Sequence, residues 1–76
     1  MRMTRNARKH GIDPGDVRAV LTAPLQSIIQ DDLVLHIGLN RHRDLLEVVV
    51  APGDPVTVVH AMRLRPANYP LLRAGS

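Results

Sequence analysis

The chain has 76 residues, with ten basic and seven acidic side chains and a formal net charge of +3 at neutral pH. A chain this short allows one domain, expected to span residues 1–76, with a marginal core that a partner would help to cover. It contains no cysteine, which excludes disulfides and thiolate zinc sites, and its aliphatic composition favours β structure. No apolar run approaches membrane-spanning length and no signal-like segment opens the chain, so the protein is expected in the cytoplasm and not at a membrane.

Two short helices are predicted near the N-terminus. The first covers residues 4–10 and ends at Gly11, a residue suited to the left-handed position after a helix. The second follows Asp13, whose carboxylate can cap free backbone amides, and starts at Pro14, which suits the first helical position. Pro24 ends this helix.

Four strands are predicted next, because apolar extended segments alternate with turn signals. Asp31-Asp32 predicts a tight polar turn, and residues 52–55 form a Pro-Gly-Asp-Pro turn signal. Short connections between successive strands imply an antiparallel meander. The predicted strands cover residues 25–30, 33–39, 45–51 and 56 to 62 or 64.

A final short helix is predicted from Pro66, because proline suits the first helical position and Pro70 breaks or kinks the helix early. Residues 74–76 are expected to form a loose tail. The fold class is therefore predicted as α+β, with the order ααββββα. A four-stranded antiparallel sheet would carry helices packed on one face.

Charge is distributed unevenly along the chain. Residues 1–12 carry four bases and no acid, residues 13–32 carry four acids against Arg18, and residues 48–76 carry three arginines against Asp54. If the fold brings the two ends together, they form one positive surface able to attract RNA or an acidic protein segment. The alternative is a set of ordinary solvated arginines.

Residues 58–66 carry the strongest functional pattern. An apolar strand leads directly into the imidazole of His60 and the guanidiniums of Arg63 and Arg65. Guanidiniums bind phosphate bidentately and keep their charge, and an imidazole moves protons near neutral pH. Metal-free RNA cleavage needs a base, an acid and cations around the phosphorus. The pattern therefore favours a small ribonuclease.

Each of these residues also has a structural interpretation. His60 is the first candidate for proton transfer, but it can instead line the core and bond a backbone carbonyl. Strand alternation predicts that Val58 and His60 share one face and that Arg63 and Arg65 share the other, if the strand stays regular that far. The two arginines can grip adjacent phosphates, form a solvated edge or pair with Glu47 in a structural bridge. Glu47 is predicted to orient an arginine, because the pKa of an exposed carboxyl is too low for an efficient base.

The remaining candidates lie near the two ends of the chain. Lys9 follows a helix, where the helix dipole alone explains a cation, and His10 can transfer protons or pack under the turn. Tyr69, the single aromatic residue, can stack on a base, shuttle a proton or seal the final helix against the sheet. The histidines lack the spacing of metal ligands, so no metal or other cofactor is expected. The predicted catalytic residues are His60, Arg63, Arg65 and Tyr69, with Glu47 in support, and the predicted RNA-binding residues are Lys9, His10, Arg5 and Arg8.

Several of these markers occur in a characteristic order. They are Arg8-Lys9-His10-Gly11-Ile12, then Val17, Val20 and Pro24, then Ile37-Gly38, Leu45-Leu46-Glu47-Val48-Val49 and residues 59–65. In this order and spacing, residues 5–73 resemble the BrnT-like toxins of bacterial type II toxin–antitoxin modules, which belong to the RelE-like ribonuclease superfamily. Members often begin with an aromatic strand that has no counterpart at Met1-Arg2-Met3.

The resemblance implies a helix-flanked antiparallel sheet and metal-independent cleavage of mRNA, on or near the ribosome, that inhibits translation and growth. It also implies a co-expressed antitoxin as partner, and a homodimer is a further possibility. The alternative is a toxin-fold binding module that is catalytically weak or inactive and engages an antitoxin or RNA. A general RNA-binding domain is disfavoured, because aromatic stacking platforms are absent from the sequence.

Overall fold

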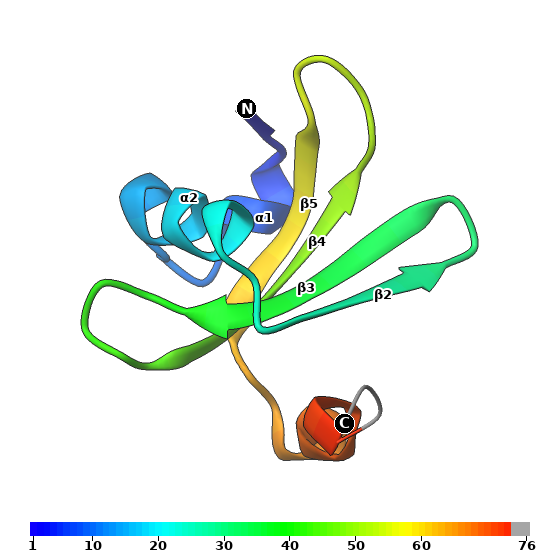
Figure 1. Ribbon diagram of the computed structural model, residues 1–76. Coiled ribbons are helices and arrows are strands. Elements are labelled where there is room, and N and C mark those ends of the chain that lie inside the picture. The colour runs from blue at the N-terminus through cyan, green and yellow to red at the C-terminus, as the bar shows by residue number, and fades with distance from the viewer. Residues whose placement is uncertain (74–76) are drawn as a thin grey trace.

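A five-stranded mixed sheet organises the chain, and the computed structural model describes residues 1–73 (Figure 1). The protein is a small α+β domain whose strands run in the order β1-β5-β4-β3-β2. The predicted loose tail at residues 74–76 lies outside the described residues. The elements are β1 (Arg2–Met3), α1 (Arg5–Arg8), α2 (Pro14–Thr22), β2 (Gln26–Gln30), β3 (Leu33–Leu39), β4 (Leu45–Ala51), β5 (Thr57–Arg63) and the 3-10 helix η1 (Pro66–Arg73).

Strands β2 to β5 form the predicted antiparallel meander. Gln30 pairs with Leu33 across the two-residue turn at Asp31-Asp32, and Asp31 adopts a left-handed φ of 57°. Tight hairpin turns require positive φ, and aspartate accepts it more readily than most residues. The turn signals therefore placed the second and third strands correctly, because the bounds of β3 and β4 match the prediction.

β1 is the strand that the sequence did not predict. It pairs in parallel with the start of β5, so the sheet is mixed and five-stranded, not antiparallel and four-stranded. The Arg2 amide donates to the Val56 carbonyl at 2.9 Å, and the Thr4 amide donates to the Val58 carbonyl at 3.0 Å. A two-residue strand is too short to show alternation of polar and apolar residues, and its backbone hydrogen bonds do not depend on side-chain type. The sequence therefore carries no local signal for β1.

The two α-helices begin at side-chain caps. Thr4 Oγ1 accepts a hydrogen bond from the Ala7 amide at 3.1 Å, and Asp13 Oδ1 accepts one from the Gly15 amide at 2.7 Å. α1 is only four residues long, shorter than the helix predicted over residues 4–10. Within residues 1–73, no helix is long and apolar enough to cross a membrane.

Helices cover both faces of the sheet, not one as predicted. On β4, Leu46 and Val48 belong to the cluster under α1 and α2, whereas Leu45 and Val49 pack against a second cluster. Alternate residues of a strand point to opposite faces, so the two clusters lie on opposite sides. η1 covers the second cluster and lies apart from α1 and α2 (Figure 1). The first cluster contains Ala7, Val17, Val20, Leu46, Val48, Val50, Val58 and Ala61, and the second contains Leu35, Ile37 and Leu64.

A β-bulge in β5 decides which face His60 occupies. Val49 of β4 pairs with His60, but the next residue, Val50, pairs with Val58, so Val59 is an extra residue in β5. Val58 therefore faces α1 and α2, whereas His60 faces the side of η1. The prediction that these two side chains share a face is wrong, because one inserted residue shifts the alternation.

We expect Asp13→Ala to lower the free energy of unfolding by about 1 kcal/mol, because this carboxylate caps α2. Asp13→Asn is the matched control, since asparagine caps equally well and the ion pair it removes is exposed. Urea denaturation followed by circular dichroism measures both variants. Equal stability of Asp13→Ala and the unsubstituted protein would contradict the role of this cap.

Candidate functional site

Glu47 is a buried carboxylate in the middle of β4, with a side chain 1% exposed. Its Oε2 contacts His60 Nε2 at 2.8 Å and accepts hydrogen bonds from Arg65 Nε at 3.0 Å and Nη2 at 2.7 Å. Its Oε1 accepts from the Arg65 amide at 2.9 Å and from Asn68 Nδ2 at 3.1 Å. We call Glu47, His60, Arg65 and Asn68 the Glu47 cluster. Because an ionised carboxylate only accepts hydrogen bonds, Nε2 of His60 carries the proton in this contact.

Three consecutive parts of the fold assemble the Glu47 cluster. β4 and β5 are neighbours, and the bulge turns His60 to the face that Glu47 occupies. Arg65 lies beyond the end of β5 and directly follows Leu64, whose amide donates to the Leu45 carbonyl at 3.0 Å. The Asn68 amide donates to the Arg65 carbonyl at 2.8 Å and closes the first turn of η1. This turn brings the Asn68 side chain to the Glu47 carboxylate.

Opposing effects act on the pKa of Glu47. Burial raises this pKa, but hydrogen bonds from the side chain and backbone amide of Arg65, from His60 and from Asn68 outweigh burial and lower the pKa to about 2. The hydrogen bonds to Glu47 also raise the pKa of Arg65. Glu47 therefore orients an arginine, as predicted, but it is buried and not exposed.

The low pKa of Glu47 predicts a loss of stability in acid. The folded pKa of about 2 lies below the ordinary value of 4.5, so the carboxylate stabilises the fold above pH 4.5 and loses this contribution as the pH falls towards 2. At about 1.4 kcal/mol per pKa unit, the lost contribution is about 3 kcal/mol. Denaturation midpoints measured between pH 7 and pH 2 test this, with Glu47→Gln expected to show a shallower acid decline. An identical decline in the two proteins would contradict the assignment to Glu47.

His10 brings the end of α1 to the Glu47 cluster. The ring centroids of His10 and His60 lie 6.1 Å apart with an interplanar angle of 77°, an edge-to-face arrangement. Asn6 Nδ2 donates to the Val59 carbonyl at 2.9 Å, which holds α1 along β5. Two imidazoles from distant parts of the chain therefore lie side by side, and His10 is exposed.

His60 presents one ring nitrogen to solvent. Its side chain is 18% exposed, and its Nε2 is occupied by Glu47. Across residues 1–73 every buried side-chain nitrogen and oxygen has a hydrogen-bond partner, and Nδ1 of His60 has none, so Nδ1 reaches solvent. The carboxylate thus holds the ring while its other nitrogen faces outward, as in oriented catalytic histidines.

The two predicted phosphate-binding arginines do not share a face. Arg65 bonds Glu47 and is about half exposed, whereas Arg63 pairs with Asp44 at 3.3 Å and is 73% exposed. Arg63 lies opposite Leu46, on the side of α1 and α2. The strand ends at Arg63, so alternation does not extend to Arg65. Arg65 is therefore the guanidinium beside His60.

η1 differs from the predicted short helix. It continues through Pro70 to Arg73 as a 3-10 helix. Leu71 and Leu72 pack against the sheet, whereas Tyr69 is 52% exposed and does not seal the helix. Asn68 was missed, because no periodicity marks an amide that reaches its partner only through a turn.

The basic residues of α1 lie on the surface. Arg5, Arg8 and Lys9 are exposed and form no ion pair within the described part of the chain. They precede His10, so α1 joins a basic segment to the imidazole pair. Among residues 1–73, no three histidine or carboxylate side chains converge as metal ligands.

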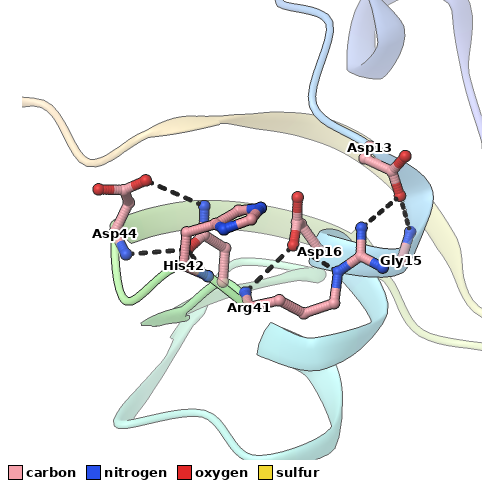
Figure 2. Close-up of polar contacts among 7 residues, drawn as sticks. Asp13, Gly15, Asp16, Arg41, His42 and Asp44 are labelled. Atoms are coloured by element: carbon pink, nitrogen blue, oxygen red, sulfur yellow. Dashed lines mark hydrogen bonds and ion pairs between the residues drawn. The ribbon is translucent and has the colours of Figure 1, made fainter.

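A second polar group ties the β3–β4 loop to the start of α2 (Figure 2). Arg41 Nε donates to Asp16 at 2.8 Å, its backbone amide to Asp16 at 3.1 Å and its Nη2 to Asp13 at 3.0 Å. The hydrogen bonds from Arg41 lower the pKa of Asp16 and raise the pKa of Arg41. A Cβ at Gly15 would lie 3.0 Å from the guanidinium carbon, so glycine makes room for Arg41. These charges are paired with one another, and the group holds the loop in place.

The fold and site together define a small α+β domain that presents a carboxylate-held imidazole, a guanidinium and a second imidazole. Comparisons with protein-family models, curated proteins and solved structures find no match for this chain. The chemistry of the Glu47 cluster and the order of the sequence markers therefore carry the functional argument.

Proposed function

We propose that the chain is a BrnT-like toxin of the RelE-like superfamily and that it cleaves RNA without a metal ion. The observation that carries the proposal is the 2.8 Å contact between Glu47 and His60, beside the guanidinium of Arg65. A carboxylate that orients an imidazole is a recurring device for setting a general base. A guanidinium beside it can stabilise charge on a phosphate.

The proposed reaction assigns one role to each of these groups. Nδ1 of His60 takes the proton of the RNA 2′-hydroxyl, and the 2′-oxygen attacks the adjacent phosphorus. Glu47 stabilises the imidazolium that forms, and Arg65 stabilises the negative charge on the phosphoryl oxygens. The bond from phosphorus to the 5′-oxygen breaks, and His10 donates a proton to this leaving oxygen. The products are a 2′,3′-cyclic phosphate and a 5′-hydroxyl.

Exposed basic and aromatic residues on the two segments that carry His10 and Asn68 support RNA as the substrate. Arg5, Arg8 and Lys9 lie on α1 or directly after it, next to His10, and can neutralise phosphates of the strand. Tyr69 is exposed on η1 and can stack on a base. The proposed substrate is mRNA in the cytoplasm, on or near the ribosome, and the proposed protein partner is an antitoxin that blocks this surface.

Purified protein incubated with end-labelled RNA in EDTA tests the proposal. We expect fragments with 2′,3′-cyclic phosphate ends, and no cleavage of a strand carrying 2′-deoxyribose throughout. Sequencing of RNA ends after a short pulse of expression then locates the sites in cells. RNA that stays intact in both experiments, with a folded protein, would refute the nuclease proposal.

A binding module of the same fold is the second candidate. The observation that favours it is that Arg63 and Arg65 both already form ion pairs, which leaves fewer free guanidinium donors for phosphate. This module would bind the product of a neighbouring gene, such as an acidic or ribbon-helix-helix antitoxin, while its expression leaves growth and RNA intact. Co-purification of the pair, together with the cleavage assay, separates the two functions.

A further inference from the structure

β2 is an open edge of the sheet. It is the last strand in the order β1-β5-β4-β3-β2. The opposite edge is shielded, because β1 is only two residues long and α1 lies beside β5, with Asn6 bonding the Val59 carbonyl. Within residues 1–73, β2 is therefore the full-length strand with one side left unpaired.

The hairpin geometry identifies the free backbone groups of β2. Gln30 and Leu33 close a two-residue turn, so they exchange backbone hydrogen bonds, and this pattern recurs at every second residue. Ile28 and Gln26 therefore also direct their amides and carbonyls to β3. Ser27 and Ile29 direct theirs away from the sheet.

β2 lacks the features that usually protect an edge strand. Its sequence, Gln-Ser-Ile-Ile-Gln, contains no charge, proline or glycine, and no bulge interrupts its pairing from Gln26 to Gln30. Ile29 is 80% exposed, the largest exposed fraction among the large apolar side chains of the described residues. Natural edges usually carry charged residues, prolines or bulges, because an open ladder recruits another strand.

The strand is complementary to itself. Consider two β2 strands, one from each copy, in an antiparallel pair centred on Ile28. Gln26 of one copy then lies opposite Gln30 of the other, and Ser27 lies opposite Ile29. The outward backbone groups of each strand therefore face the outward backbone groups of the other. Ile28 meets its own copy across the axis. Asp31 lies beside the uncharged Leu25 of the second copy, so no like charges face each other although the chain is basic overall.

We infer that two copies of this chain associate through antiparallel pairing of their β2 strands about a two-fold axis at Ile28. The amide and carbonyl of Ser27 bond those of Ile29 in the second copy, and the two sheets become one continuous sheet. Ile29 covers Ser27 of the second copy and reaches its own equivalent diagonally.

This interface lies away from His60 of the proposed nuclease site, although Gln26 Nε2 of β2 donates to the Leu71 carbonyl of η1 at 3.3 Å. β5, which carries His60, is three strands from β2, or roughly 14 Å at about 4.8 Å per strand. The Glu47 cluster therefore stays accessible in the dimer, which would present two such clusters on opposite flanks of one sheet.

Sedimentation equilibrium of the full chain over roughly 1–500 µM tests the dimer, since a short edge interface predicts micromolar affinity. We expect the mass to rise to twice the monomer value with concentration. Ile29→Lys should shift the midpoint at least tenfold higher, because a charge would replace the exposed apolar side chain at the interface. Leu39→Lys, a partly exposed leucine of β3, is the matched control and should dimerise normally.

Disulfide formation tests the register. The chain has no cysteine, so Ile28→Cys can cross-link only to its own copy, and residues opposite each other across the axis have the Cα separation that a disulfide needs. Gln30→Cys, expected opposite Gln26, should cross-link poorly. A monomer at every concentration, or a dimer that Ile29→Lys leaves unchanged, would overturn the inference. Equal cross-linking of both cysteine variants would overturn the register.

Discussion

Glu47→Ala is expected to lower the free energy of unfolding by about 3 kcal/mol. The substitution leaves His60, Arg65 and Asn68 without the acceptor that they share, and breaking a buried ionic group costs about 3–5 kcal/mol. The lower end applies because Arg65 is about half exposed, so water can solvate its freed guanidinium. Stability of a domain this small is only a few kcal/mol, so this loss removes much of it.

Two further variants test whether the burial of Glu47 causes the loss of stability expected for Glu47→Ala. Glu47→Gln keeps the size of the side chain but places amide hydrogens against donors, so we expect a loss of about 2 kcal/mol. Asp44→Asn breaks the exposed pair with Arg63 and should cost less than about 1 kcal/mol. Urea titrations at pH 7 measure all of them. If Glu47→Ala and Asp44→Asn proved equally mild, the buried carboxylate would not be central to the fold.

His60→Gln is expected to slow the proposed RNA cleavage by about 10²–10⁴-fold, the usual contribution of a positioned acid–base group. Glutamine retains a hydrogen bond to Glu47, so the fold should survive, but it cannot transfer a proton at neutral pH. Single-turnover cleavage of labelled RNA gives the rate, and thermal unfolding checks the fold. His42→Gln, in the exposed β3–β4 loop, is the control and should cleave normally.

Arg63 provides a second comparison for the same assay. The sequence predicted Arg63 and Arg65 as one phosphate clamp, whereas the fold places Arg63 on the other face, paired with Asp44. Arg63→Ala should therefore retain most of the cleavage rate, in contrast to His60→Gln. A loss as deep as that of His60→Gln would mean that the phosphate binds on the side of α1 and α2, and our assignment of Arg65 would be wrong.

Local signals in the sequence predicted most of the fold, because they act over a few residues. The cap at Asp13 places the start of α2, and the Asp31-Asp32 turn places the β2–β3 hairpin. The alternation of β5 failed at Val59, because a bulge is a property of two paired strands and one strand alone does not show it.

The candidate site was predicted in part. His60, Arg65, Glu47 and His10 were singled out by residue type and by the resemblance, and the fold brings these four side chains together. The burial of Glu47 and the role of Asn68 were not foreseen. Both depend on the position of η1 on the sheet. Leu71 and Leu72, in the second half of η1, hold it there by packing against the second cluster.

The order of residues along the chain was therefore sufficient for the α+β class, the meander from β2 to β5 and the identity of the titratable groups, because propensities, caps and turns are short-range. The tertiary structure alone decided that β1 joins the sheet, that His60 faces Glu47 and that Arg63 and Arg65 separate. These outcomes arise from backbone pairing and burial between segments distant in sequence, whose free energies exist only once the segments meet.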